Sequence, residues 1–203
     1  YAMKAAGGDV GFRLGFASGS TSQGNDEASH TDINLGLGYS VGSDAAAHDL
    51  SLNIDYGMAE VKDASEGNGM GVAANYRGYL KNKGGNNVDL GIQASVGFGS
   101  GSEKPNGGDA AETSGLAAGV GAGPVFRAGT STVALLAGVG YVANTDANDN
   151  ENSALVVPAV NLALESPMND WVTFRGGIGY AKAMNTNTPD VGDESTDTAG
   201  ATT

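Results

Sequence analysis

The chain has 203 residues, enough for one large all-β domain or two small domains. It contains 34 Gly, 5 Pro and no Cys, and the Gly residues follow no triplet repeat, which excludes a collagen helix and a disulfide scaffold. The formal net charge of -13 argues against nucleic acid as a partner, because phosphates need Lys and Arg. No apolar run approaches the roughly 18–20 residues of a membrane-spanning helix.

Alternation of apolar and polar residues predicts a series of β-strands along the chain. Residues 31–42 show it most clearly, because Leu35 and Leu37 share one face while Asn34 and Gly36 share the other. Nine strands are legible, and their apolar faces run from Val10 to Phe16, Ile33 to Val41, Leu50 to Met58, Met70 to Tyr76, Val88 to Phe98, Leu116 to Phe126, Val133 to Tyr141, Val156 to Leu164 and Val172 to Tyr180.

The links between these strands alternate in length. Short links fall at 43–47, 81–87, 129–131 and 166–170, and long links at 18–30, 59–68, 100–113, 144–152 and 183–203. The long links hold 15 of the 23 acidic residues and only two basic residues, Lys62 and Lys104. Short turns on one rim and long loops on the other are typical of outer-membrane barrels, with the short turns in the periplasm. The sequence therefore predicts an acidic extracellular rim.

Small and aromatic residues indicate that the apolar face meets lipid. The polar face is crowded with Gly, which suits a confined lumen better than a solvated sheet surface. Aromatic residues of the apolar face fall at strand ends, where amphipathic rings would form girdles at the lipid headgroups. The predicted girdle residues are Phe16, Tyr56, Phe98, Tyr141 and Tyr180 near the long links, and Tyr39, Tyr76 and Phe126 toward the short ones.

On these features, residues 10–182 resemble the outer-membrane β-barrel superfamily, and within it the small OmpA/OmpX-type or porin-like barrels. The resemblance implies an all-β, antiparallel up-and-down transmembrane β-barrel of about ten strands, within roughly 8–12, in the bacterial outer membrane. Residues 1–203 would form a single domain, with 183–203 as a polar acidic loop or tail. Because nine strands break the even-number rule, either a tenth strand is expected beyond Thr203 or the register of the termini differs from this interpretation. No leader follows Tyr1, so any export signal is expected to be absent from this sequence or already removed.

Charged residues of the polar face cluster near the short links. Neighbouring strands alternate in sign, which predicts a lumenal charge belt with Arg77 between Asp49 and Asp89, and with Arg175 beside Glu165. The simpler interpretation is an ion-pair network that fills a narrow lumen, and the alternative is a constriction that filters solutes. The belt residues are Asp49, Arg77, Asp89, Arg127, Glu165 and Arg175.

A calcium site is weakly suggested in one long link. Asp146, Asn148 and Asn150 copy the opening of an EF-hand loop, but Glu151 replaces the turn Gly and Val157 replaces the closing Glu. No metal site or cofactor is therefore predicted. Only two His residues are present, His30 in a long link and His48 at the opposite rim, so the chain is not expected to be an enzyme.

The predicted function is a structural anchor or a narrow pore with an ion-paired lumen and acidic extracellular loops, surrounded by outer-membrane lipid. A surface adhesin or recognition protein, which would use the acidic loops, is one alternative. A subunit of a larger cell-envelope assembly is another, because small residues of the lipid face would allow other envelope proteins or copies of the chain to approach. Those small residues include Ala118, Ala122, Ala137 and Gly176.

Overall fold

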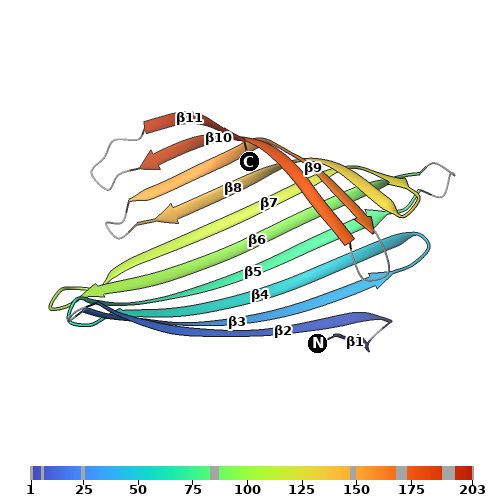
Figure 1. Cartoon of the computed structure of the whole chain (residues 1–203). Coiled ribbons are helices and arrows are strands. Elements are labelled where there is room, and N and C mark those ends of the chain that lie inside the picture. The colour runs from blue at the N-terminus through green and yellow to red at the C-terminus, as the bar shows by residue number, and fades with distance from the viewer. Residues whose placement is uncertain are drawn as a thin grey trace.

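The computed structural model describes residues 2–5, 7–23, 26–82, 87–146, 150–167, 173–188 and 195–202. Eleven β-strands form one antiparallel sheet in which each strand pairs with its neighbours in the chain (Figure 1). In the described part of the chain, no helix has the length and hydrophobicity to span a membrane.

The strands are β1 (Ala2–Ala5), β2 (Gly8–Gln23), β3 (Asp26–Gly42), β4 (Ala46–Val61), β5 (Ser65–Leu80), β6 (Val88–Pro105), β7 (Ala111–Ala128), β8 (Ser131–Thr145), β9 (Glu151–Pro167), β10 (Thr173–Thr188) and β11 (Ser195–Thr202). From β2 to β10 each strand has 15–18 residues. About 9–11 residues are enough for a tilted strand to cross a bilayer, so each of these strands is longer than a bilayer crossing requires.

Strand pairing continues through most of the segments predicted as long links. The β4–β5 ladder runs to the pair Val61 and Ser65, where Asp63 has a φ of 60°, and the β6–β7 ladder runs to Glu103 and Ala111. The prediction of long loops was therefore wrong in conformation. Apolar and polar residues alternate only where one face of a strand is apolar. The backbone of a polar hairpin can pair without such alternation, so the sequence pattern did not reveal these parts of the strands.

The C-terminal segment also differs from the prediction of a loop or tail over 183–203. β10 continues to Thr188, and β11 pairs with it from the Thr202–Tyr180 pair to the Ser195–Asn187 pair. A tenth long strand beyond those predicted therefore already lies before Thr203. β11 consists of Ser, Thr, Asp, Ala and Gly without an apolar stripe, so periodicity could not reveal it.

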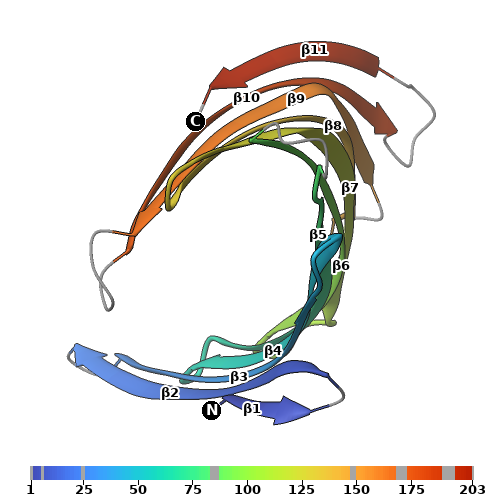
Figure 2. The same ribbon diagram turned by 90° about the vertical axis from the view of Figure 1, so that its right-hand side faces the viewer.

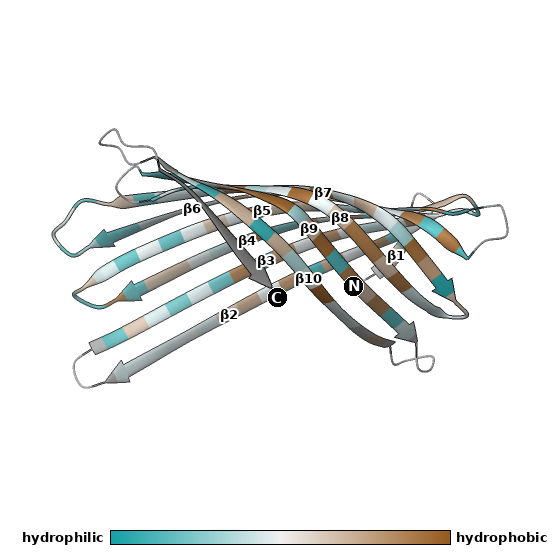
Figure 3. Ribbon diagram, turned by 90° about the horizontal axis from the view of Figure 1, so that it is seen from above, coloured by the Kyte–Doolittle hydropathy of each residue, from teal (hydrophilic) through white to brown (hydrophobic). Residues whose placement is uncertain are grey.

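The sheet curls into an open trough (Figure 2). Among the described residues, no ladder joins β2 or the short β1 to β11, so these strands form the two edges. Polar and apolar residues alternate along the strands (Figure 3), so the two faces differ sharply in character. Polar residues from β4 to β9 line one shared hollow, which places the polar face on the concave side.

A β-bulge in β9 reverses the predicted facing of one segment. Across the bulge the β8 partners change from Gly138–Ala159 to Gly140–Val156, so two residues of β9 oppose one of β8. Val156, predicted on the apolar face, therefore lies beside Gly140 on the polar face, 3.6 Å from a Cβ built there. Its neighbour Leu155 replaces it on the apolar face, because one inserted residue shifts the two-residue period.

Candidate functional site

The convex face is an apolar surface exposed over most of the sheet. Large side chains on it are strongly exposed, for example Leu14 at 64% and Ile178 at 69%, whereas Val125 at 2% is the one buried hydrophobic residue among those described. An exposed apolar surface of this extent marks a region that contacts lipid or protein, not water. The sequence-based assignment of apolar residues to one continuous face agrees with the cross-strand pairing, apart from the β9 bulge.

The predicted girdle residues all lie on this convex face. Most are exposed, and Tyr39 and Tyr76 are half-buried at the short-turn side of β3 and β5. The Tyr76 hydroxyl lies 2.9 Å from Nδ1 of His48, and the two rings stack with centroids 6.0 Å apart. The exposed girdle residues are Phe16, Tyr56, Phe98, Phe126, Tyr141 and Tyr180.

On the concave face, Arg77 and Asp49 stand opposite each other across β4 and β5. Nε of Arg77 lies 3.6 Å from the Asp49 carboxylate, which also accepts a hydrogen bond of 2.6 Å from the Ser40 hydroxyl. The side chains remain 59% and 39% exposed. This pair is therefore accessible to water, and its contribution to stability is small.

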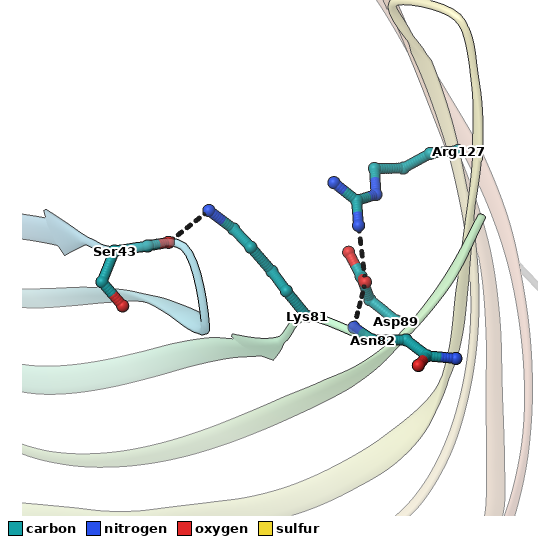
Figure 4. A network of polar contacts seen from close by, with 5 residues as sticks. All are labelled: Ser43, Lys81, Asn82, Asp89 and Arg127. Carbon is teal, nitrogen blue, oxygen red and sulfur yellow. Dashed lines mark hydrogen bonds and ion pairs between the residues drawn. The ribbon is translucent and has the colours of Figure 1, made fainter. Parts of the chain in front are cut away.

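Asp89 pairs with Arg127 and not with Arg77, which corrects the predicted order of the belt. The distance from the Arg127 guanidinium to the Asp89 carboxylate is 2.7 Å, and the backbone N–H of Asn82 donates to the same oxygen at 2.9 Å (Figure 4). The register of β5 and β6 explains the difference: Arg77 lies opposite Gln93, four residues from Asp89.

The remaining predicted residues are only partly described. Glu165 and Arg175 are direct register partners across β9 and β10, and the Arg175 side chain lies outside the described residues. Asn148 of the calcium candidate also lies outside them, while the Asp146 carboxylate accepts hydrogen bonds from the backbone and side chain of Asn150. No group of three His, Asp or Glu residues suited to a metal ion occurs in the part of the chain that the structure describes.

A second polar network was not predicted. The Arg13 guanidinium donates to the side-chain oxygen of Asn34, whose amide nitrogen donates to the Asp55 carboxylate. The two-residue alternation of the strands puts these side chains on the polar face, but only the register of β2, β3 and β4 brings them together.

Between these charged groups, the concave face forms a hollow of about 490 Å³. Ser51, Asn75, Gln93, Ser95 and Asn161 contribute hydroxyl and amide groups to its lining. Its floor over β7 and β8 is formed largely by Gly, because Gly119, Gly138 and Gly140 occupy inward positions there.

Gly residues of the concave face have two different roles. At Gly138 an added Cβ would lie 2.3 Å from the Val120 carbonyl oxygen, and at Gly123 it would lie 2.0 Å from that of Leu135, so both positions require Gly for close strand approach. At Gly99 an added Cβ would only meet the Met70 carbonyl oxygen at 3.7 Å. Gly at such positions leaves open space on the concave face.

The sequence matches no protein-family profile, and a search of curated proteins returned no significant match. Among solved structures, the chain is similar to the translocator domain of the autotransporter NalP from Neisseria meningitidis, with a TM-score of 0.50 and 14% identity over 97% of this chain and 74% of that one. It is also similar to BauA, the ferric preacinetobactin receptor from Acinetobacter baumannii, with a TM-score of 0.55 and 10% identity over 97% of this chain and 40% of that one.

A third similar structure is the beta domain of the Bordetella autotransporter BrkA, with a TM-score of 0.44 and 12% identity over 96% of this chain and 93% of that one. At these identities the likeness concerns the fold alone. With the NalP translocator domain and BauA the chain shares an all-β fold of antiparallel up-and-down strands, although its sheet is open over the described residues.

Proposed function

We propose that this chain is an integral β-barrel of the bacterial outer membrane whose concave face lines a narrow, water-filled passage. The observation that carries the proposal is the hollow of about 490 Å³ across β4 to β9. An eight-stranded barrel is just wide enough for its own side chains to fill it. Here ten long or medium strands, β2 to β11, would surround the lumen, and Gly at inward positions supplies no side chain to fill it.

The membrane location is supported by the inverted distribution of polarity. The convex face exposes apolar side chains, while the concave face carries Arg, Asp, Asn and Ser. Free strand edges are unstable in hydrocarbon, because each unpaired backbone group there costs several kcal/mol. The edges β2 and β11 run antiparallel, since adjacent strands alternate in direction, so we expect them to pair in the membrane.

The exposure of the ion pairs to water supports an open passage more than a lumen filled by side chains. Arg77 and Asp49 line the hollow and keep more than a third of each side chain exposed. The better buried pair, Asp89 and Arg127, lies toward the short turns beside Asn82. The charged residues therefore border the hollow without filling it.

A second candidate is a subunit of a larger envelope assembly, and one observation favours it. The convex face has an apolar depression of about 570 Å³, and its lining includes Ala74 and Ala94 beside Tyr39 and Tyr76. Small residues at such a place allow another chain to approach closely. Replacing Ala94 with Trp would fill the depression, and a loss of oligomers in detergent, measured by native mass spectrometry, would favour this candidate.

The direct test of a passage is single-channel recording with the purified full chain in planar lipid bilayers. An aqueous passage predicts stepwise increases in current that remain steady and scale with voltage. Repeated insertion of folded protein without current would reject the passage and leave an anchor or an assembly subunit.

A further inference from the structure

The middle of the concave face carries an uncharged row of residues that crosses the sheet. Successive ladders place Gly38 opposite Ser51, Ser51 opposite Asn75, Asn75 opposite Ser95, Ser95 opposite Gly119, and Gly119 opposite Gly140. Apart from Gly38, each of these residues lines the hollow of about 490 Å³. The row therefore brings hydroxyl and amide groups from three strands together above a floor of Gly.

The polar side chains in and beside this row lie close to the backbone floor of the next strand. The Asn75 amide nitrogen is 3.4 Å from the Ser51 hydroxyl. A Cβ built on Gly121 would be 3.2 Å from the amide nitrogen of Gln93, and one built on Gly119 would be 3.4 Å from the Ser95 hydroxyl. Larger residues at these two Gly positions would displace the polar side chains, so the Gly floor and the polar row belong to one arrangement.

The charges that line the hollow are compensated. Asp49 receives Arg77 at 3.6 Å and the Ser40 hydroxyl at 2.6 Å. An ionic solute in the hollow would meet Asp49 and Arg77 already paired with each other, and the rest of the lining is uncharged. The site is therefore poorly suited to phosphate, carboxylate or metal ions.

Amide and hydroxyl groups each both donate and accept hydrogen bonds, as do the hydroxyl groups of a sugar. The volume of about 490 Å³ falls within the roughly 300–1,000 Å³ of small-molecule sites. We infer that the hollow lined by Ser51, Asn75, Gln93, Ser95 and Asn161 binds uncharged polyhydroxylated solutes such as small sugars. The inference rests on the proposed passage and names the class of solute that it would accept.

Saturation-transfer NMR on the purified full chain in detergent micelles tests this site without requiring a current. Sucrose should receive magnetisation from the protein, and sodium gluconate, a charged polyol, should receive several-fold less. Asn75→Ala and Gln93→Ala should each weaken sucrose binding about two- to tenfold, because each removes hydrogen-bonding groups from the lining. Asn53→Ala is the matched control, since Asn53 lies on the concave face of β4 but outside the hollow.

Far-UV circular dichroism confirms that each variant is folded, and Asn75→Asp, which preserves side-chain shape, serves if Asn75→Ala does not fold. Equal signals from sucrose and gluconate, or sucrose binding unchanged in both Asn75 and Gln93 variants, would overturn the site. A bilayer current without any sucrose signal would overturn the site and leave the passage. A sucrose signal without current would support the site and reject the passage.

Discussion

Asp89 and Arg127 face each other across β6 and β7 at 2.7 Å, with the aspartate side chain only 5% exposed. Asp49 and Arg77 form the corresponding pair on β4 and β5 at 3.6 Å, with 39% and 59% exposure. The two pairs have the same chemistry and the same face of the sheet, so the depth of the carboxylate is what distinguishes them. Their energetic roles should differ accordingly.

Replacing Arg127 with Met should lower the free energy of unfolding by about 2–3 kcal/mol. The variant leaves a buried carboxylate with the Asn82 N–H as a remaining donor, and the partial exposure of Arg127 moderates the loss. Arg77→Met is the matched control and should lower it by less than about 1 kcal/mol, because that pair is exposed. Urea titration in lipid vesicles measures both, and equal losses would contradict the distinction.

Adjacent residues of β6 test which face meets lipid. Ile92 lies on the convex face and Gln93 on the concave face. Ile92→Arg should destabilise the protein in vesicles by roughly 2–4 kcal/mol, as charges do at the lipid face of a barrel, whereas Gln93→Arg should be milder. Similar losses of unfolding free energy for both variants would argue against the inside-out assignment.

The bulge in β9 makes a prediction at the level of single residues. Leu155 should face lipid and Val156 the lumen, the reverse of what uninterrupted alternation gives. Spin labels on Leu155→Cys should collide mainly with oxygen, which concentrates in lipid, and labels on Val156→Cys mainly with a water-soluble nickel complex. The opposite result, read by power-saturation EPR in vesicles, would mean that the bulge is absent in the membrane.

The orientation of the two rims can be tested on intact cells that express single-Cys variants. Ala110, in the β6–β7 hairpin, should react with a membrane-impermeant maleimide, whereas Ala45, in the β3–β4 turn, should react only after the cells are opened. Both positions are exposed, so accessibility across the membrane decides the result. Labelling of Ala45 alone would reverse the orientation.

Side-chain alternation was sufficient to predict nine strands and the face of nearly every residue in them. It succeeded because one face of the sheet is continuously apolar. A shift of one residue would move every apolar side chain of a strand to the polar face, so the pattern allows one assignment only. Where that constraint is missing, as in β11 and in the polar hairpin around Asp63, the strands were not predicted. In β9 a single extra residue was enough to misplace Val156.

The charged residues of the concave face show how far the site could be predicted from the sequence. Alternation along the strands correctly placed Asp49, Arg77, Asp89 and Arg127 on one face, but the partner of each depends on the register between strands. The register of β5 and β6 places Arg77 opposite Gln93, and Asp89 pairs with Arg127 instead. The hollow was not predicted either, because its residues come together only through the five successive ladders from β4 to β9.

The most direct test of the proposed passage combines current recording with cysteine modification at two adjacent positions. Ser95 lines the hollow and Val96 is exposed on the convex face, and the chain has no Cys of its own. In planar bilayers, a small water-soluble thiol reagent should reduce the steady current through Ser95→Cys and leave that through Val96→Cys unchanged. Absence of current in the folded protein, or a reduction only in Val96→Cys, would contradict a passage lined by the concave face.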